Sequence, residues 1–268
     1  VLIGGDETES GQNAVETLVD IYANWIPKEK ILTTNVWSSE LAKLASNAML
    51  AQRISSINSL SALCEKTGAN IDELSKAIGM DQRIGPHFLK ASVGFGGSCF
   101  QKDILNLVYL CNYYGLVEVA EYWHQVIKIN DYQKDRFAQK IIDHFGGDLT
   151  GKRIAILGWA FKANTNDSRE SPVIYIAEKL YKSGANLEIY DPMVSEESIF
   201  RDIDFYWNHS AKLSQGSIRV SKKVPNFVEI DVSAILTEWD EFKNFDFKSS
   251  KIFDGRNILK KSFYSIGK

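Results

Sequence analysis

The pattern of apolar and polar positions divides the chain into three segments, and the first covers residues 1–35. An apolar run at 1–5 is typical of the end of a buried strand, and residues 10–23 repeat apolar side chains at the spacing of an amphipathic helix. A second short strand is predicted near residues 30–33. A strand–helix–strand unit of this size is too small to bury a core by itself. We therefore expect residues 1–35 to be the last part of a larger domain.

The second segment, residues 36–148, has helical spacing almost throughout. Apolar residues recur every three or four positions across 39–67 and stop at Gly68, which is typical of a helix C-terminus. Further helices are predicted over 100–114 and 117–145, and each is followed directly by glycine. The sequence therefore predicts a helical central domain.

In the third segment, residues 149–268, short apolar runs alternate with helical spacing. The run 152–158 is followed by a polar loop, a helix over 173–184 and a strand over 186–190. This order is the unit of a doubly wound parallel sheet, in which ligands bind outside the carboxyl ends of the strands. Two later apolar runs are expected to extend this sheet: 232–236 and 251–253.

The predicted fold class is therefore α/β, with a helical central domain followed by a doubly wound parallel-sheet domain. The expected boundaries are 1–35, 36–148 and 149–268. Residues 194–227 follow neither the helical nor the strand period, so no element is predicted there.

Composition narrows the class of protein further. The 268 residues carry 31 Lys and Arg against 34 Asp and Glu, a formal charge of −3, which argues against general affinity for nucleic acid or an anionic membrane. Three cysteines are too few for a disulfide scaffold, so a reducing, cytoplasmic compartment is expected. His87, His124, His144 and His209 have no Cys or His partner at zinc spacing, so no metal site is expected.

Cys99 is the candidate nucleophile. It follows a Gly-Phe-Gly-Gly-Ser run at residues 94–98 and directly precedes a predicted helix. The glycines let the backbone approach a ligand closely, and the positive end of the helix dipole favours the nucleophilic thiolate. The alternative is a glycine-rich turn that merely contains a cysteine. Cys64 and Cys111 lie among apolar residues of predicted helices and are interpreted as core residues.

Two pairs of polar residues at helical i, i+4 spacing accompany this cysteine. Asp103 lies four residues after Cys99, so both would share one face, where a carboxylate can orient or deprotonate an attacking water. Lys43 and Asn47 form the second pair and could donate hydrogen bonds to a developing oxyanion. The alternatives are an acid that stabilises the first helical turn and a solvated helix face.

The glycine fingerprint of dinucleotide-binding loops is absent from the sequence. Residues 94–99 begin like it, but Cys99 stands where the last glycine belongs and no predicted strand leads into the loop. Residues 158–161 follow a strand but lack the glycines. The third segment therefore has the topology of a nucleotide-binding domain without the usual pyrophosphate loop.

Residues 94–103, Gly-Phe-Gly-Gly-Ser-Cys-Phe-Gln-Lys-Asp, resemble the catalytic loop of the UDP-glucose/GDP-mannose dehydrogenase family, in particular of the animal UDP-glucose 6-dehydrogenases. The resemblance covers nearly the whole chain. Its other segments are 38–59 with Lys43 and Asn47, 79–90 with Arg83, 154–171, 237–239 and 253–256. A match of this length around a glycine-flanked cysteine is far more specific than a lone glycine motif.

The resemblance implies an NAD-dependent oxidoreductase, because the family oxidises the C6 alcohol of UDP-glucose to the carboxylate of UDP-glucuronate, a glycosaminoglycan precursor in animals, and reduces two NAD. It implies that Cys99 attacks the intermediate aldehyde to give a thiohemiacetal, which a second oxidation converts into a thioester. Lys43 and Asn47 would stabilise the oxyanions, and Asp103 would help the water that hydrolyses the thioester.

The resemblance also implies binding residues. Those implied for UDP-glucose are Lys43, Leu44, Ala45, Ser46, Asn47, Arg83, Lys90, Ala91, Ser92, Val93, Gly94, Phe95, Gly96, Lys162 and Arg256. Those implied for the nicotinamide side of NAD are Cys99, Phe100, Gln101, Lys102 and Arg169. The loop 90–96 would hold the sugar, Lys162 and Arg256 would lie near the UDP, and Arg83 would reach the site of a neighbouring subunit. The helix over 39–67 would form a dimer core, and animal members assemble into hexamers.

One part of the family pattern has no counterpart here. The glycine fingerprint, with a catalytic glutamate and threonine, belongs to an N-terminal NAD-binding Rossmann domain, of which residues 1–35 resemble only the end. The sequence therefore predicts that this chain alone binds NAD poorly and turns over negligibly. Two alternative functions remain. One is a sister dehydrogenase acting on UDP-N-acetylhexosamines or GDP-mannose, and the other is a non-catalytic module for nucleotide-sugar binding or assembly.

Overall fold

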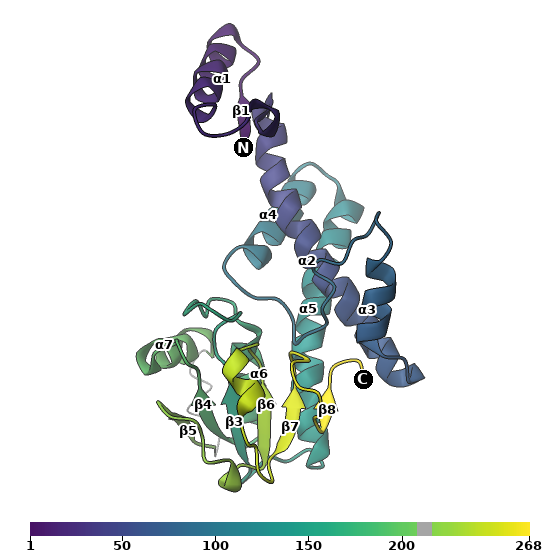
Figure 1. Cartoon of the computed structure of the whole chain (residues 1–268), viewed down its shortest axis with the longest axis vertical. Helices are drawn as coiled ribbons and strands as arrows, with labels where there is room; N and C mark the ends of the chain where they lie inside the picture. Colours follow the sequence, from purple (N-terminus) through teal and green to yellow (C-terminus); the bar gives the residue numbers. More distant parts are fainter. Residues whose placement is uncertain (208–215) are drawn as a thin grey trace.

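The N-terminal part of the molecule is a small β–α–β unit. In the computed structural model, which describes residues 1–207 and 216–268, strand β1 (Leu2–Gly5) pairs in parallel with β2 (Leu32–Asn35), and α1 (Glu9–Tyr22) crosses between them. The unit lies at the opposite end of the molecule from the larger sheet (Figure 1). Ile3 is its buried residue and α1 has none, so the unit holds no core of its own, as its length predicts.

Four helices follow, and they position the candidate catalytic residues. They are α2 (Val36–Thr67), α3 (Ile71–Gly79), α4 (Phe100–Tyr113) and α5 (Val117–His144). The first begins three residues earlier than the apolar spacing predicts, because the side chain of Asn35 caps it by accepting from the backbone N–H of Ser38 (2.8 Å). It ends at Gly68 in the left-handed conformation (φ 79°), as predicted. Helices α2, α4 and α5 pack against one another (Figure 1).

The C-terminal part is a parallel six-stranded sheet in the order β5-β4-β3-β6-β7-β8. Its strands are β3 (Arg153–Leu157), β4 (Asn186–Tyr190), β5 (Ile218–Val220), β6 (Val232–Ile235), β7 (Lys251–Asp254) and β8 (Tyr264–Ser265), and its helices are α6 (Pro172–Lys182) and α7 (Glu196–Tyr206). Short 3-10 turns lie at Lys28–Lys30, Phe227–Glu229 and Asp240–Asn244. The strand order reverses beside β3, as in dinucleotide-binding folds. The predicted α/β fold class is confirmed.

Three elements of this sheet domain were missed by the sequence prediction. Helix α7 and strand β5 lie in the segment 194–227, and β8 follows the last predicted strand. Helix α7 was overlooked although Ile199 and Ile203 share one face at i, i+4 spacing, whereas β5 and β8 are too short to show alternation. His209 lies outside the described residues.

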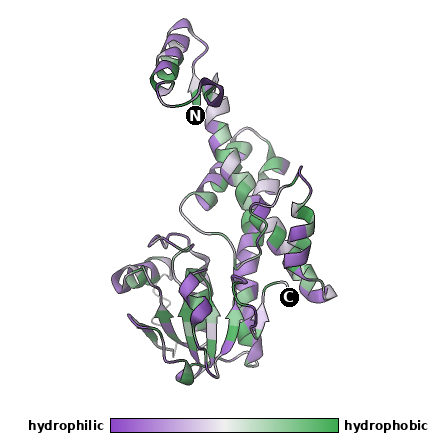
Figure 2. Ribbon diagram, viewed as in Figure 1, coloured by the Kyte–Doolittle hydropathy of each residue, from purple (hydrophilic) through white to green (hydrophobic). Residues whose placement is uncertain are grey.

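One hydrophobic core joins the sheet to the central helices. Buried residues of β3, β4, β6 and α6 continue through the C-terminal half of α5 to Ile57 and Cys64 of α2 and Ile71 of α3. Figure 2 shows the strands of the sheet as predominantly hydrophobic. Cys64 and Cys111 are buried, which confirms their interpretation as core residues. None of the helices in the described ranges has the length and apolar character needed to cross a membrane.

Candidate active site

The structure brings three of the predicted catalytic residues into contact. Asn47 of α2 donates from Nδ2 to Oδ2 of Asp103 on α4 at 2.6 Å, and Nζ of Lys43 lies 3.7 Å from the same oxygen. The Asp103 side chain is 10% exposed, whereas that of Lys43 is 67% exposed. The side chains of Lys43 and Asn47 thus do not form a purely solvated helix face, because both contact the Asp103 carboxylate.

This cluster retains hydrogen-bond donors for another acceptor. An amide nitrogen carries two hydrogens and an ammonium three, and Asp103 takes one from each at most. The second amide hydrogen and two ammonium hydrogens therefore remain for an oxygen that acquires negative charge, which is the chemistry expected of an oxyanion-binding pair.

Cys99 lies one helical turn from this cluster. Its carbonyl accepts the backbone N–H of Asp103 at 2.9 Å and it stands at the N-cap position of α4, as predicted. Its side chain is exposed. The pKa of the neighbouring Arg169 guanidinium lies above its ordinary value because of the hydrogen bonds and charge of Asp167, with a smaller contribution from the charge of Cys99.

Glycine is required in the loop before Cys99 because this loop passes close to the sheet domain. Gly97 has a φ of 88°, and a Cβ there would lie 3.2 Å from the Phe161 ring. A Cβ on Gly96 would lie 2.5 Å from the carbonyl oxygen of Glu170. The N–H of Gly97 donates to the carbonyl of Arg169 at 2.9 Å, which fixes this approach. The cysteine loop is therefore held between the helical and sheet domains.

A cleft of about 300 Å³ opens between these two domains beside the cysteine loop. Its lining residues are Ile54, Phe88, Lys90, Ser92, Gly94, Phe95, Gly96, Phe100, Phe161, Lys162, Glu238 and Arg256. Most of the residues implied for the sugar loop and for the UDP thus face one cavity. A cleft with apolar and aromatic walls and three cationic side chains suits a ligand with a ring and a diphosphate.

Arg256 lines this cleft, but its guanidinium is already bonded to groups of the protein. Its Nε donates to the carbonyl of Leu236 at 2.6 Å and lies 3.3 Å from Oε2 of Glu238, and a second nitrogen donates to the carbonyl of Phe161 at 3.1 Å. Burial lowers the pKa of its guanidinium. The residue therefore ties together the loops after β3 and β6 and has fewer donors left for a ligand than an exposed arginine.

Several residues implied by the resemblance do not line the cleft. Ala91 and Val93 are fully packed into the shared core, because the loop alternates inward and cleft-facing side chains. Arg83 is exposed and paired with Asp81, and Arg169 is exposed and paired with Asp167. The others outside the cleft are Lys43, Leu44, Ala45, Ser46 and Asn47 on α2, Cys99 at the N-cap of α4, and Gln101 and Lys102 on α4.

Four cleft residues were not predicted as site residues: Ile54, Phe88, Phe161 and Glu238. All four lie in segments that resemble the family, at 38–59, 79–90, 154–171 and 237–239. The three apolar residues were overlooked because an isolated apolar side chain is usually a core residue.

The backbone N–H groups of the loop after β3 are already bonded to a carboxylate of the protein, so they are not available to a pyrophosphate. Asp191, at the end of β4, accepts the backbone N–H groups of Trp159 (2.6 Å) and Ala160 (3.1 Å). In a dinucleotide-binding domain the N–H groups of this loop bind phosphate instead. The loop 158–161, which lacks the glycine fingerprint, thus binds an internal carboxylate where a dinucleotide-binding loop binds phosphate. Within residues 1–207 and 216–268, no three His, Cys, Asp or Glu side chains are grouped as a metal would require.

Comparison with known proteins defines the class. Residues 37–132 match the central domain of the UDP-glucose/GDP-mannose dehydrogenase family, and residues 155–261 match its UDP binding domain. These two matches cover most of the chain, which belongs to the UDP-glucose/GDP-mannose dehydrogenase family.

Individual relatives agree with this assignment. UDP-glucose 6-dehydrogenase 1 of Glycine max is 54% identical across the whole of this chain, and UDP-glucose 6-dehydrogenase 3 of Arabidopsis thaliana is 53% identical. The chain spans 61% of the length of each. The solved structure of a UDP-glucose dehydrogenase from Pyrobaculum islandicum is similar with a TM-score of 0.81 and 29% identity, over 98% of this chain and 56% of that one.

Proposed function

We propose that this chain carries the catalytic cysteine and the nucleotide-sugar cleft of an NAD-dependent UDP-glucose 6-dehydrogenase. The observation that carries the proposal is the convergence of Lys43, Asn47 and Asp103 one helical turn from the exposed Cys99. The relatives reported above are plant and archaeal enzymes of this name, so the proposal concerns the family activity and not an animal subgroup.

Different residues of this chain act in the separate steps at C6 of the sugar. The Cys99 sulfur forms a bond to C6 of the aldehyde, while the carbonyl π electrons move to oxygen and Lys43 and Asn47 donate hydrogen bonds to that oxygen. Once C6 is at the thioester level, water attacks it with Asp103 accepting the proton. The C–S bond then breaks, so that the carboxylate is released and the thiolate is restored.

Substrate binding is assigned to the two sides of the cleft. The loop 90–96 holds the sugar, and Lys162, with the remaining donors of Arg256, binds the UDP. Two molecules of NAD, bound in turn, would each accept one hydride, with Cys99, Phe100, Gln101, Lys102 and Arg169 on the nicotinamide side. The loop after β3 does not fit the pyrophosphate of NAD, since Asp191 accepts the N–H groups of Trp159 and Ala160 there.

We expect this chain on its own to turn over negligibly. The glycine fingerprint is not in its sequence, and the N–H groups of Trp159 and Ala160 in the loop after β3 are already bonded to Asp191. The measurement is NADH formation, followed by the ultraviolet absorbance of the reduced nicotinamide, with saturating UDP-glucose and NAD. Turnover at the rate of a full-length plant relative would contradict this expectation.

The experiment that tests the proposal is protection of Cys99 from alkylation. Cys99 is exposed and Cys64 and Cys111 are buried, so iodoacetamide should label Cys99 first. UDP-glucose should slow this labelling, read by mass spectrometry, whereas glucose alone should not. Labelling that is unaffected by UDP-glucose at every concentration would refute the proposed site.

Assembly and location follow from the same proposal. Met49 and Leu63 on α2 are exposed apolar residues (58% and 59%), which supports α2 as the core of a dimer and Arg83 as a contact to a neighbouring subunit, with hexamers built from such dimers. Free thiols at Cys64, Cys99 and Cys111 suit the reducing cytoplasm.

A further inference from the structure

The loop that lines the sugar side of the cleft is held mainly by side chains. Ser92, Gly94 and Phe95 line the cleft, and this stretch belongs to no helix or strand. The N–H of Val93 donates to the carbonyl of Gly255 at 2.9 Å. The main-chain groups of Ser92 and Phe95 instead pair with amide side chains from the central helices, so the shape of the loop depends on those amides.

Three amide side chains form what we call the amide cradle: Asn58 of α2 and Asn130 and Gln133 of α5. Asn58 Oδ1 accepts the N–H of Ser92 at 2.9 Å, and Gln133 Nε2 donates to the carbonyl of Ser92 at 2.7 Å. Asn130 makes both bonds to Phe95, accepting its N–H at 2.8 Å and donating to its carbonyl at 3.0 Å. All three residues are at most 1% exposed, so water cannot replace these bonds.

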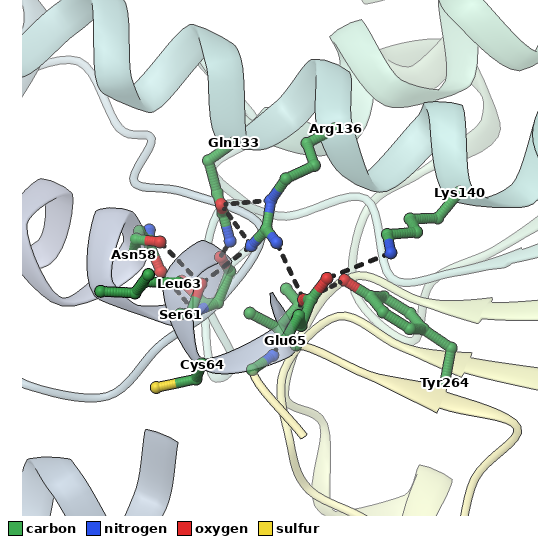
Figure 3. Close-up of polar contacts among 12 residues, drawn as sticks. Asn58, Ser61, Leu63, Cys64, Glu65, Gln133, Arg136, Lys140 and Tyr264 are labelled. Atoms are coloured by element: carbon green, nitrogen blue, oxygen red, sulfur yellow. Dashed lines mark hydrogen bonds and ion pairs between the residues drawn. The ribbon is translucent and has the colours of Figure 1, made fainter. Parts of the chain in front are cut away.

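The orientation of Gln133 is set by an arginine. Nε and one terminal nitrogen of Arg136 donate to Oε1 of Gln133 at 3.2 and 2.9 Å, and the same terminal nitrogen donates to Ser61 at 2.8 Å (Figure 3). Because arginine has no acceptor, the amide oxygen of Gln133 must face it. The amide nitrogen is therefore directed at the carbonyl of Ser92.

The same network reaches the C-terminal segment. Arg136 pairs with Glu65 at 2.8 Å, and Glu65 also accepts from the Tyr264 hydroxyl at 2.7 Å and from the N–H of Gly267 at 3.1 Å (Figure 3 shows Glu65, Arg136 and Tyr264). A continuous series of buried and part-buried contacts thus runs from β8 to the cleft loop.

We propose that Asn58, Asn130 and Gln133 are positioning residues for nucleotide-sugar binding, which act by holding the main chain of Ser92 and Phe95 in the shape that lines the cleft. The proposal rests on the proposed function, because it assigns the loop 90–96 to the sugar. A loop without regular backbone pairing binds a ligand well only when its conformation is fixed before binding. Buried amides that bond both the N–H and the carbonyl of Ser92, and both of these groups of Phe95, supply this fixation.

The test uses the isosteric variant Gln133→Glu. A carboxylate at this position still accepts from Arg136 but cannot donate to the carbonyl of Ser92, and the added charge is balanced because Arg136 and Lys140 then face two carboxylates. The matched control is Gln139→Glu on the same helix, since Gln139 bonds to the exposed Asp143 and, among the residues that the structure describes, has no bond to the loop 92–95. Asn130→Asp is a second test variant, because it keeps the acceptor for Phe95 and loses the donor.

The readouts are calorimetric titration with UDP-glucose and with UDP, and hydrogen exchange of the peptide containing residues 92–95. Gln133→Glu and Asn130→Asp should each weaken UDP-glucose binding on the order of tenfold, weaken UDP binding much less, and speed exchange at 92–95, while Gln139→Glu changes none of these. A merely structural role would lower both affinities alike or only the melting temperature.

Each failure has its own signature. Wild-type affinity for UDP-glucose with unchanged exchange at 92–95 in both test variants would overturn the positioning role. A folded wild-type chain that binds neither ligand would overturn the proposed function, and the exchange measurement would still decide whether the amide cradle holds the loop.

Discussion

Replacing Glu65 by alanine is expected to destabilise the fold by about 3–5 kcal/mol, because it leaves a buried cation without its partner. The Glu65 side chain is 8% exposed and lies 2.8 Å from Arg136 and 3.2 Å from Lys140. It also accepts from Tyr264 and Gly267, so its loss removes two hydrogen bonds that join the C-terminal segment to α2. The measurement is urea denaturation followed by circular dichroism. The control is Glu73→Ala, an exposed residue of α3, with an expected change below about 1 kcal/mol.

Glu65 also predicts a pH dependence. Burial acts to raise its pKa, but the hydrogen bonds from Tyr264 and Gly267 and the charge of Arg136 outweigh this and hold the pKa below 4.5. A lowered folded-state pKa stabilises the fold at pH values above the unfolded pKa, and the contribution is lost as the pH falls through the folded value. Stability should therefore decrease below pH 4.5 in the wild type and less steeply in Glu65→Gln. Equal slopes in the two proteins would contradict this account.

Replacing Asp191 by alanine is the second substitution with a large expected effect, a loss of about 3 kcal/mol or more. The reason is that one buried carboxylate satisfies five donors, which would be left unpaired in the interior of the sheet domain. They are the backbone N–H groups of Trp159, Ala160, Met193 and Val194 and the indole N–H of Trp239, at 2.6 to 3.2 Å.

Thermal and urea unfolding of Asp191→Ala check this expectation. The matched control is Asp240→Ala, because the Asp240 side chain is 92% exposed and pairs only with Lys243. If Asp191→Ala unfolds at the same urea concentration as Asp240→Ala, the internal carboxylate does not stabilise the loop after β3. The bond pattern would then need another explanation.

Most of the fold could be predicted from periodicity because its long elements bury one continuous face or both faces. Strand β4 is found at the predicted residues and α5 within one residue of its predicted end. Strands β5 and β8 could not be predicted, because they are only three and two residues long, whereas α7 was overlooked although Ile199 and Ile203 have helical spacing. The start of α2 was misplaced because capping by Asn35, rather than apolar spacing, decides it.

The candidate site shows what local spacing can and cannot provide. Two i, i+4 pairs predicted Lys43 with Asn47 and Cys99 with Asp103, but only the packing of α2 on α4 brings Asp103 to Asn47. The amide cradle could not be predicted from the sequence. Its residues are 34 to 41 positions from their partners, and a buried amide carries no local signal. Arg256 was predicted near a ligand from the resemblance, and only its carbonyl partners reveal its structural role.

The central claim is that the cleft between the helical and sheet domains binds UDP-glucose, and calorimetric titration of this chain tests it most directly. The account predicts one site per chain for UDP-glucose, weaker competition by UDP-N-acetylglucosamine and GDP-mannose, and on the order of tenfold weaker binding in Lys162→Ala, which removes an exposed cation from the cleft. Tighter binding of either competitor would favour a sister dehydrogenase. Absence of binding by the folded wild-type chain, or binding that Lys162→Ala leaves unchanged, would contradict the claim.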